Sequence, residues 1–371
     1  MGVSLLLPLE GVRVVDLTNF LPGPFCSMIL SDFGAEVIKV ERPPKGDPAR
    51  YQGGMFTSAG RNKKSVALDL KSDEGKEALR KLVLNCDVLM EGFRPGVLDR
   101  LGFGWEAVRA LNDRVVYCSI SGFGQTGPNR DLAGHDVNYL SIAGALSISG
   151  DPDGPPVAGG GVQVADLTSA MYAAVSVLAA IINRGRTGKG AYLDVSMTDC
   201  VLAFMGPRIL EYFDRGMPPK GTMMGRSGFG AYRTRDGKYV SVGCLELNFW
   251  QRLCDALGDP ELGRDPKYLG WFDRMKYRAE INPRLDEKFL LRDRDEWMKI
   301  LREADVPVTP VNRIEELEND PQFVSRGMIK RVNGQPLVAF PVKFEGLELR
   351  EPGPAPELGA DNGGILGGPG L

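Results

Sequence analysis

Short apolar runs rich in β-branched residues alternate with amphipathic, helix-like segments over the first 125 residues of the chain. This alternation is typical of βαβ units, in which a strand, a helix and a parallel strand follow one another. A helix over residues 72–85 is predicted because a serine opens it and acidic residues follow in its first turn. Strands are expected at 12–17, 36–41, 65–70, 87–92 and 115–121. The pattern predicts an α/β fold class with a Rossmann-like large domain built on a parallel sheet.

The apolar pattern changes after this half. Residues 140–163 are rich in Gly, Pro, Ser and Asp, which favours a loop. The next segment, 167–182, is the most apolar of the chain, but it is slightly short for a bilayer span and contains Thr and Ser. We therefore expect a buried helix there, followed by a strand at 191–197.

A second, smaller α/β domain is predicted further along the chain. It begins with a hairpin around Asp236 and Gly237, and charged amphipathic helices continue to about residue 320. Segments 328–332 and 337–344 have strand patterns and are expected to return toward the first domain, ahead of an irregular tail. The expected domains are 1–205, completed by 335–371, and 225–330.

Composition narrows the class of protein. Lys and Arg number 45 against 48 Asp and Glu, which leaves a net charge of −3 and argues against a nucleic-acid-binding protein. The six cysteines are far apart, so neither a disulfide framework nor a zinc site is predicted, and we expect buried thiols in a reducing compartment. No basic segment precedes the short apolar patch near the amino terminus. A cytoplasmic protein without a membrane partner is expected.

His135 is the only histidine of the chain. Imidazole is the side chain whose ordinary pKa suits proton exchange near neutral pH, although a lone histidine is more often structural than catalytic. Gly134 before it allows close approach of a ligand. Asp136 after it either orients the ring or caps the helix that follows, and capping is the simpler interpretation.

Two further carboxylates are candidates for chemistry. Asp166 precedes the apolar helix, where a helix cap is the simpler interpretation, but a helix start also gathers N–H groups that stabilise an oxyanion. Glu246 follows the hairpin of the second domain and is either a catalytic helper or a first-turn acid. The chain has no G-x-S-x-G motif of a serine hydrolase and no cluster of Cys and His for zinc. The remaining options are acid–base catalysis or nucleophilic catalysis by carboxylates.

A set of motifs extends over nearly the whole chain, at residues 9–43, 60–83, 87–108, 119–128 and 183–199. Together they resemble the family III CoA-transferases, the group that includes formyl-CoA transferase, carnitine CoA-transferase and α-methylacyl-CoA racemase. The resemblance implies an interlocked homodimer, in which each ring-like chain threads through its partner, and an acyl-CoA site near the interface. CoA would then be part of the substrate, so no separate cofactor is expected.

Within this family, the segment GHDVNYL (134–140) is similar to the racemase branch. The histidine of that motif works with an aspartate in proton transfer, and by position His135 and Asp166 take these two roles. Transferase relatives commonly lack the histidine and use the residue that matches Asp166 as a nucleophile. The segment VGCLELNFW (242–250) also resembles the racemases and makes Glu246 an acidic helper.

The resemblance further implies where CoA binds. Its phosphates need cations and backbone donors, and residues 61–64 (RNKK) add local positive charge. Two departures from the family pattern are Phe229, where racemases often have tyrosine, and LGADN at 358–362 in place of LGEH. By match to the family, the CoA contacts are Leu21, Arg42, Leu68, Lys71, Gly92, Phe93 and Arg100.

The sequence therefore predicts a racemase of 2-methylacyl-CoA thioesters. One of His135 and Asp166 would remove the α-proton and the other would return a proton to the opposite face, with Glu246 beside Asp166. N–H groups at the start of the apolar helix would hold the enolate oxygen. Two alternatives stay open: CoA transfer between carboxylic acids with Asp166 as covalent nucleophile, and a non-catalytic acyl-CoA binding protein. Six methionines either form an adaptable face for the acyl chain, as the resemblance to the racemases implies, or fill the core: Met171, Met197, Met205, Met217, Met223 and Met224.

Overall fold

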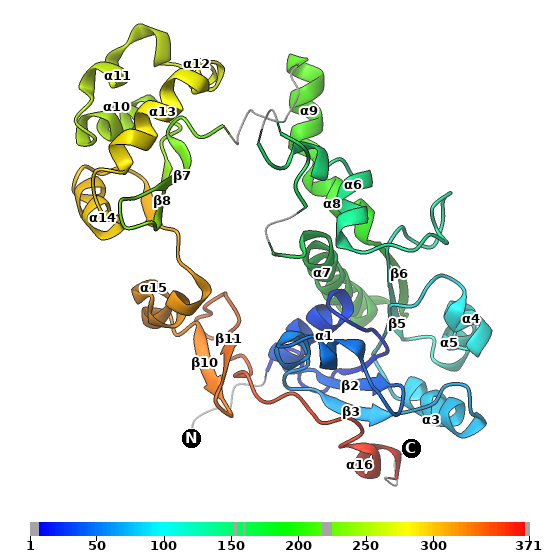
Figure 1. The fold of residues 1–371 in the computed structure, drawn as a ribbon. Helices are drawn as coiled ribbons and strands as arrows, with labels where there is room; N and C mark the ends of the chain where they lie inside the picture. Colours follow the sequence, from blue (N-terminus) through cyan, green and yellow to red (C-terminus); the bar gives the residue numbers. More distant parts are fainter. Residues whose placement is uncertain (1–6, 152–153, 159–160, 217–224, 368–371) are drawn as a thin grey trace. The chain divides into compact units, whose positions relative to one another are not determined.

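The structure is a computed structural model that describes residues 7–151, 154–158, 161–216 and 225–367. It divides into two compact units (Figure 1). Compared with the expected domains, the chain returns to the large unit at Pro321 rather than at residue 335, and segment 144–158 belongs to the small unit. The large unit comprises Met1–Ala143, Gly159–Phe204 and Pro321–Leu371, and the small unit comprises Gly144–Ala158 and Met205–Asp320.

A six-stranded sheet forms the centre of the large unit, in the order β3-β2-β1-β4-β5-β6. Every neighbouring pair is parallel, which confirms the predicted Rossmann-like sheet. The strand order reverses between β1 and β4, and open α/β sheets bind ligands beyond the carboxyl ends of the strands at such a point. The strands are β1 (Arg13–Asp16), β2 (Glu36–Glu41), β3 (Lys64–Ala67), β4 (Val88–Glu91), β5 (Val116–Ser121) and β6 (Ala191–Ser196).

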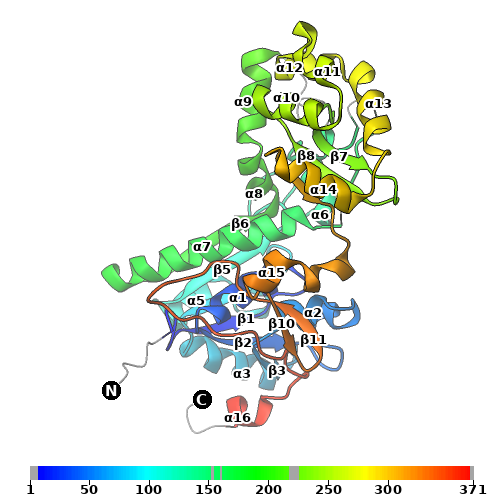
Figure 2. The same cartoon turned by 90° about the vertical axis from the view of Figure 1, so that its left-hand side faces the viewer.

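Helices cover both faces of this sheet (Figure 2). Val14 points to a core shared with α1 and α7, and Val15 points to a second core on the opposite face with α3, α4 and α5. Because both faces are covered, the central strands β4 and β5 are buried at every position, whereas the edge strand β6 alternates between half-buried and exposed positions over its first four residues. The helices are α1 (Pro22–Asp32), α3 (Asp73–Leu84), α4 (Val97–Leu101), α5 (Trp105–Leu111) and α7 (Val164–Thr187), with the short α2 (Met55–Ala59), α6 (Asp136–Ile142) and α8 (Met197–Phe204).

Helix α7 is longer than the expected 167–182 and is only half-buried. Small residues such as Ala170 and Ala173 pack into the core beside α1, whereas Val175 and Ile182 are 59% and 61% exposed. The expectation of a buried helix is therefore wrong for this outer face, because one sheet face covers only one side of the helix. Within the described ranges, α7 is the one helix that is long and apolar enough to cross a membrane.

The small unit contains the predicted hairpin. Gly237 adopts a positive φ of 77° in the turn, and β9 adds a third antiparallel strand. Tyr232, Trp250 and Phe289 lie at the centre of its core. Its elements are α9 (Gly206–Arg215), β7 (Phe229–Arg233), β8 (Tyr239–Gly243), α10 (Leu247–Ala256), α11 (Pro260–Arg264), α12 (Trp271–Lys276), α13 (Arg278–Phe289), α14 (Arg294–Glu303) and β9 (Val308–Pro310).

The carboxyl-terminal segment is more ordered than an irregular tail. After α15 (Pro321–Ser325), β10 (Ile329–Val332) and β11 (Gln335–Val338) form a separate antiparallel hairpin. The LGADN segment then lies along the edge of β3, where Asp361 accepts a hydrogen bond from the Ser65 N–H and Asn362 accepts one from the Ala67 N–H, each at 2.8 Å. These side chains close the free edge of the sheet ahead of α16 (Asn362–Leu366).

Candidate active site

A first cavity, of about 440 Å³, lies at the carboxyl ends of β1 to β4. Its walls carry three cations, and within the described part of the chain none of the three forms an ion pair with a carboxylate. This is the place at which the strand order reverses, and unpaired cations there suit a phosphorylated ligand. Five of the seven expected CoA contacts line this cavity: Arg42, Leu68, Lys71, Phe93 and Arg100.

A second cavity, of about 690 Å³, shares Asn19 and Phe93 with the first, so the two adjoin. It contains the other two expected CoA contacts, Leu21 and Gly92. His135 and Asp166 line this same cavity, although they are thirty-one positions apart in the chain. The fold of the large unit therefore brings the two predicted catalytic side chains to one space.

His135 stands immediately before α6, at the position of its N-cap. Its backbone N–H donates a hydrogen bond to Asn138 Oδ1 at 3.0 Å, which fixes the start of the helix. The residue is exposed and lines the cavity, so it is not a core histidine.

Asp166 lies in the first turn of α7, but it is not the helix cap, because Gln163 holds that position. Among the described residues, no hydrogen bond or ion pair reaches its carboxylate. Burial, with the nearby charge of Asp136 as a second cause, raises the pKa of Asp166 to about 6. The expected capping role is wrong, and the carboxylate is left available for chemistry.

Asp136 provides the cap of α7 across the fold. Its Oδ1 accepts hydrogen bonds from the N–H groups of Ala165 at 2.6 Å and Asp166 at 3.3 Å. The expectation that these N–H groups hold an enolate oxygen is therefore wrong, because a carboxylate already satisfies them and offsets the positive end of the helix dipole. The capping role expected for Asp136 applies to α7 and not to its own helix α6.

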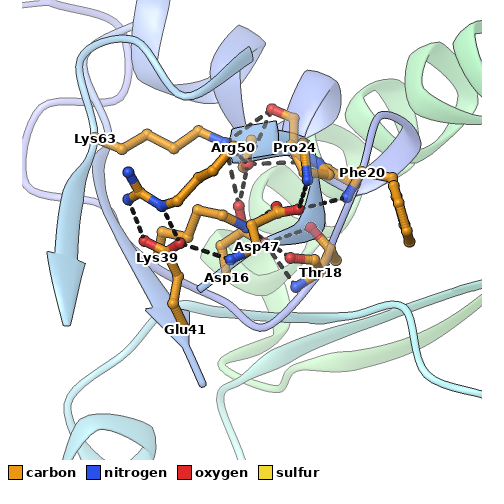
Figure 3. Close-up of polar contacts among 12 residues, drawn as sticks. Asp16, Thr18, Phe20, Pro24, Lys39, Glu41, Asp47, Arg50 and Lys63 are labelled. Atoms are coloured by element: carbon orange, nitrogen blue, oxygen red, sulfur yellow. Dashed lines mark hydrogen bonds and ion pairs between the residues drawn. The ribbon is translucent and has the colours of Figure 1, made fainter. Parts of the chain in front are cut away.

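A buried ionic network fixes the turn after β1, which lines both cavities (Figure 3). Lys39 Nζ lies 2.9 Å from Asp47 Oδ2 and donates a hydrogen bond to the Thr18 carbonyl at 2.6 Å. Asp47 Oδ1 in turn accepts a hydrogen bond from the N–H of Phe20 at 3.0 Å, and Phe20 has a positive φ of 63°. The network thus holds a backbone conformation that a non-glycine residue rarely adopts.

Lys63 forms the other half of this network. Its Nζ lies 3.2 Å from Asp16 Oδ2 and donates to the Ser27 hydroxyl at 2.7 Å and to the Pro24 carbonyl at 2.9 Å. Burial, partly opposed by Asp16, lowers the pKa of Lys63 to about 8. Burial alone would raise the pKa of Asp16, but the charges of Lys39 and Lys63 outweigh it and lower that pKa.

The RNKK segment therefore does not supply free cations for CoA. Lys63 is buried in the network, Arg61 is buried against Asp32 at 2.6 Å, and Lys64 pairs with Glu36 at 2.6 Å. Sequence reasoning missed the network. The available signal was the presence of Asp16 and Lys39 inside otherwise apolar strand patterns.

Glu91, at the end of β4, was also missed. Its Oε2 accepts a hydrogen bond from the Phe93 N–H at 2.9 Å, and its Oε1 accepts one from the Ser119 hydroxyl. Burial raises the pKa of Glu91 to about 7. Glu91 thereby fixes the turn that carries Gly92 and Phe93 into the two cavities.

The remaining predicted site residues lie elsewhere. Glu246 belongs to the small unit, where it precedes α10 as an exposed N-cap residue, so its partnership with Asp166 stays a prediction. Phe229 is in the same unit and packs against Trp271 with ring centroids 5.6 Å apart. Within the described ranges, no group of three His, Cys, Asp or Glu side chains could hold a metal ion.

The expected methionine face is only partly described. Met197 lines the second cavity, Met171 is 49% exposed on α7, and Met205 is buried. Met217, Met223 and Met224 lie outside the described residues.

The profile of CoA-transferase family III matches residues 9–362. The chain belongs to this family. A CaiB/BaiF family protein from Brucella suis, known from its crystal structure, has 32% sequence identity and a TM-score of 0.88 over 97% of this chain and 98% of its own. Its similarity agrees with the sheet and helices described above.

Two curated relatives of this family III protein are also similar over most of their length. The acetyl-CoA:oxalate CoA-transferase of Acetobacter aceti is 35% identical over 92% of this chain and 90% of its own. The succinyl-CoA–D-citramalate CoA-transferase of Chloroflexus aurantiacus is 36% identical over 96% of this chain and 89% of its own. Both are named as transferases, which favours the transferase alternative over the expected racemase and over a non-catalytic binding protein.

Proposed function

We propose that this family III enzyme transfers CoA from an acyl-CoA to a free carboxylic acid, with Asp166 as the covalent nucleophile. The observation that carries the proposal is the unbonded Asp166 carboxylate in a cavity that adjoins the cationic cavity. Acyl-CoA placed with its phosphates among Arg42, Lys71 and Arg100 would extend its thioester into the second cavity. The names of the relatives support the same reaction.

The proposed reaction has four balanced steps. The Asp166 carboxylate attacks the thioester carbonyl, which breaks the C–S bond, releases CoA thiolate and forms a mixed anhydride. The thiolate then attacks the aspartyl carbonyl, which frees the first acid and leaves an aspartyl-CoA thioester. The second acid attacks this thioester to form a new anhydride and thiolate, and the thiolate finally attacks the new acyl carbonyl. Asp166 is regenerated, and no oxidant or metal is needed.

The electrostatic state of Asp166 suits this role. A pKa of about 6 leaves the carboxyl group ionised at neutral pH while making it more basic than an ordinary aspartate. Because nucleophilicity rises with basicity, a partly desolvated carboxylate attacks a thioester more readily than a fully hydrated one. Protonation of Asp166 below pH 6 would remove the nucleophile.

Racemisation is the second candidate, and one observation favours it. His135 lines the same cavity as Asp166, so two groups able to exchange a proton face one space. Under this alternative, the imidazole and the carboxylate would act on opposite faces of the α-carbon.

One experiment separates the two reactions. A chiral 2-methylacyl-CoA is incubated in D₂O with the enzyme, alone or with an excess of a ¹³C-labelled carboxylic acid. Transfer predicts labelled acyl-CoA without α-deuterium, and we expect Asp166→Asn to abolish it. Incorporation of α-deuterium with loss of optical purity, dependent on His135 and independent of added acid, would instead establish the racemase.

We further propose that the working enzyme is a homodimer of interlocked cytoplasmic chains. The exposed apolar residues Val175 and Ile182 of α7 support a covered surface, and so do Leu210 and Phe213 of α9, which are 71% and 79% exposed. Light scattering during size-exclusion chromatography tests the proposal. We expect twice the 40.4 kDa of one chain, and a single-chain mass would contradict it.

A further inference from the structure

Residues 351–362, which we call the strap, take no part in the chemistry above. The chain reaches them only after the small unit, and their last part lies along the free edge of β3 (Figure 1). The first cavity begins where β2 and β3 end: Arg42 follows β2, and Leu68 and Lys71 follow β3. The strap therefore contacts a strand that leads directly into the wall of the first cavity.

Several hydrogen bonds join the strap to β3. Asp361 forms two of them with Ser65: its Oδ2 accepts the Ser65 N–H at 2.8 Å, and its own N–H donates to the Ser65 carbonyl at 3.0 Å. The Gly359 N–H donates to the Ser65 hydroxyl at 2.9 Å. Gly359 has a positive φ of 70°, and a Cβ atom there would lie 3.2 Å from Ala67 Cβ, so the strap approaches the strand closely. The strap thus holds Ser65 by both its backbone and its hydroxyl group.

Ser65 connects the strap to the end of β2. Its hydroxyl donates to Glu41 Oε1 at 2.7 Å, and the Glu41 carbonyl accepts the Leu68 N–H at 2.9 Å. Arg50 Nε and Nη2 each donate to the Glu41 carboxylate at 2.7 Å, and Nη2 also donates to the Pro356 carbonyl of the strap at 3.1 Å. The strap therefore reaches the Glu41 carboxylate by two routes, and Glu41 joins the ends of β2 and β3.

Glu41 is a buried charge that depends on these contacts. Burial alone would raise the pKa of Glu41, but the hydrogen bonds that its carboxylate accepts, chiefly from Arg50, outweigh burial and lower that pKa. The hydrogen bond from Ser65 is one of them. A buried carboxylate that loses a donor is costly, so the surrounding backbone shifts when a donor is withdrawn. Glu41 lines the first cavity itself and is followed in the chain by Arg42.

We propose that the strap is part of the acyl-CoA site and that Asp361 is a positioning residue for the cations of the first cavity. Asp361 holds Ser65, whose hydroxyl supports the Glu41 carboxylate. Glu41 in turn joins the ends of β2 and β3, from which Arg42 and Lys71 extend. The inference rests on the function proposed above in placing the phosphates of CoA among these cations. The strap then governs the affinity for acyl-CoA and not the chemistry at the nucleophile, which lies in the second cavity.

The test compares the full-length enzyme with Asp361→Ala, which removes the acceptor of the Ser65 N–H, and with Asp361→Asn, whose amide oxygen can still accept it. Asp265→Ala is the matched control, because Asp265 accepts a backbone N–H at 2.8 Å, from Lys267, in the small unit. Calorimetry gives the Kd for CoA, and exchange of ¹⁴C-labelled acetate into acetyl-CoA gives kcat and KM.

We expect Asp361→Ala to raise the Kd for CoA and the KM for acetyl-CoA about five- to tenfold, with kcat changed less than about twofold. Asp361→Asn should retain most of the affinity, and Asp265→Ala should bind CoA as the wild type does. A loss of folded protein would lower the number of binding sites and the apparent kcat. It would leave Kd and KM unchanged, so it is distinguished from the predicted effect.

The outcomes separate this inference from the proposed function. Unchanged Kd and KM in Asp361→Ala would overturn the inference and leave the proposed function intact, as would a lower kcat at unchanged KM. If Asp361→Ala does not fold, Ser65→Ala decides, because it keeps the backbone contacts of the strap and removes the link to Glu41: weaker CoA binding supports the inference, and equal binding refutes it. A wild type that binds CoA but exchanges no label contradicts the proposed function, while the Kd values still decide the inference. A wild type that does not bind CoA overturns both.

Discussion

The carboxylate of Asp136 caps the helix that carries Asp166, with Oδ1 2.6 Å from the N–H of Ala165 and 3.3 Å from the N–H of Asp166 itself. This contact links α6 to α7 and places a negative charge beside the candidate nucleophile. It stabilises the helix start and at the same time raises the pKa of the Asp166 carboxyl group. One side chain thus contributes both to the position and to the basicity of the group that we assign to catalysis.

Asp136→Asn should separate these two contributions. The amide oxygen can still accept the hydrogen bonds, but the negative charge is gone, so the pKa of Asp166 should fall. We expect the acid limb of the kcat/KM profile, near pH 6 in the wild type, to shift to lower pH by a few tenths of a unit, since burial remains as the larger cause. Initial rates between pH 4.5 and 8 measure the shift. Asp131→Asn, at an exposed position, is the control, and an unmoved acid limb in Asp136→Asn would contradict this account.

Asp166→Asn should stabilise the protein at neutral pH. The pKa of Asp166 is raised on folding, so its favourable contribution is complete below about pH 4 and is lost as the pH rises through about 6. Above that pH the native state holds a partly desolvated charge that asparagine avoids. We expect a gain of about 1–2 kcal/mol in the free energy of unfolding at pH 8, after allowance for partial solvation. Little change is expected at pH 4.

Urea denaturation of the wild type and of Asp166→Asn at both pH values measures this difference. A substitution that destabilises the protein equally at pH 4 and pH 8 would mean that Asp166 has a structural role instead.

Lys39→Met should weaken the large unit strongly. The substitution leaves Asp47 buried without its ion-pair partner, and breaking a buried pair in this way costs about 3–5 kcal/mol. The turn after β1 should loosen as well, because Asp47 also holds the N–H of Phe20. The double variant Lys39→Met, Asp47→Asn removes the unpaired charge and should recover part of the loss.

Chemical denaturation and the KM for acyl-CoA test this prediction together. Glu106→Gln, which breaks an exposed ion pair with Arg109, should cost less than about 1 kcal/mol. If Lys39→Met costs no more than this surface control, the buried pair does not hold the turn.

The sequence predicted the strands and helices of the large unit well, because the patterns that specify them lie within short segments of the sequence. The strand predicted at 36–41 is β2 without change, and the helix predicted at 72–85 differs from α3 by one residue at each end. His135 and Asp166 line one cavity. Their pairing was predicted from the family resemblance and not from the local sequence pattern.

Contacts between distant segments could not be predicted in the same way. Asp136 follows a histidine in a stretch typical of a helix start, and only the packing of α6 against α7 directs its carboxylate to Ala165. Lys39 and Asp47 pair because β2 and the loop after it enclose the turn after β1. The racemase prediction rested on the segments at 134–140 and 242–250, which tell which groups are present and not which reaction they perform, whereas relatives similar over most of the chain are named as CoA-transferases.

The most direct test of the central claim is to trap the activated aspartyl group of Asp166, as the mixed anhydride or the CoA thioester, with hydroxylamine. The enzyme is incubated with acetyl-CoA and hydroxylamine, digested and analysed by peptide mass spectrometry. If Asp166 is the covalent nucleophile, its peptide carries an aspartyl hydroxamate that depends on acetyl-CoA and is absent from Asp166→Asn. An unmodified Asp166 peptide from enzyme that is transferring CoA under the same conditions would contradict the claim.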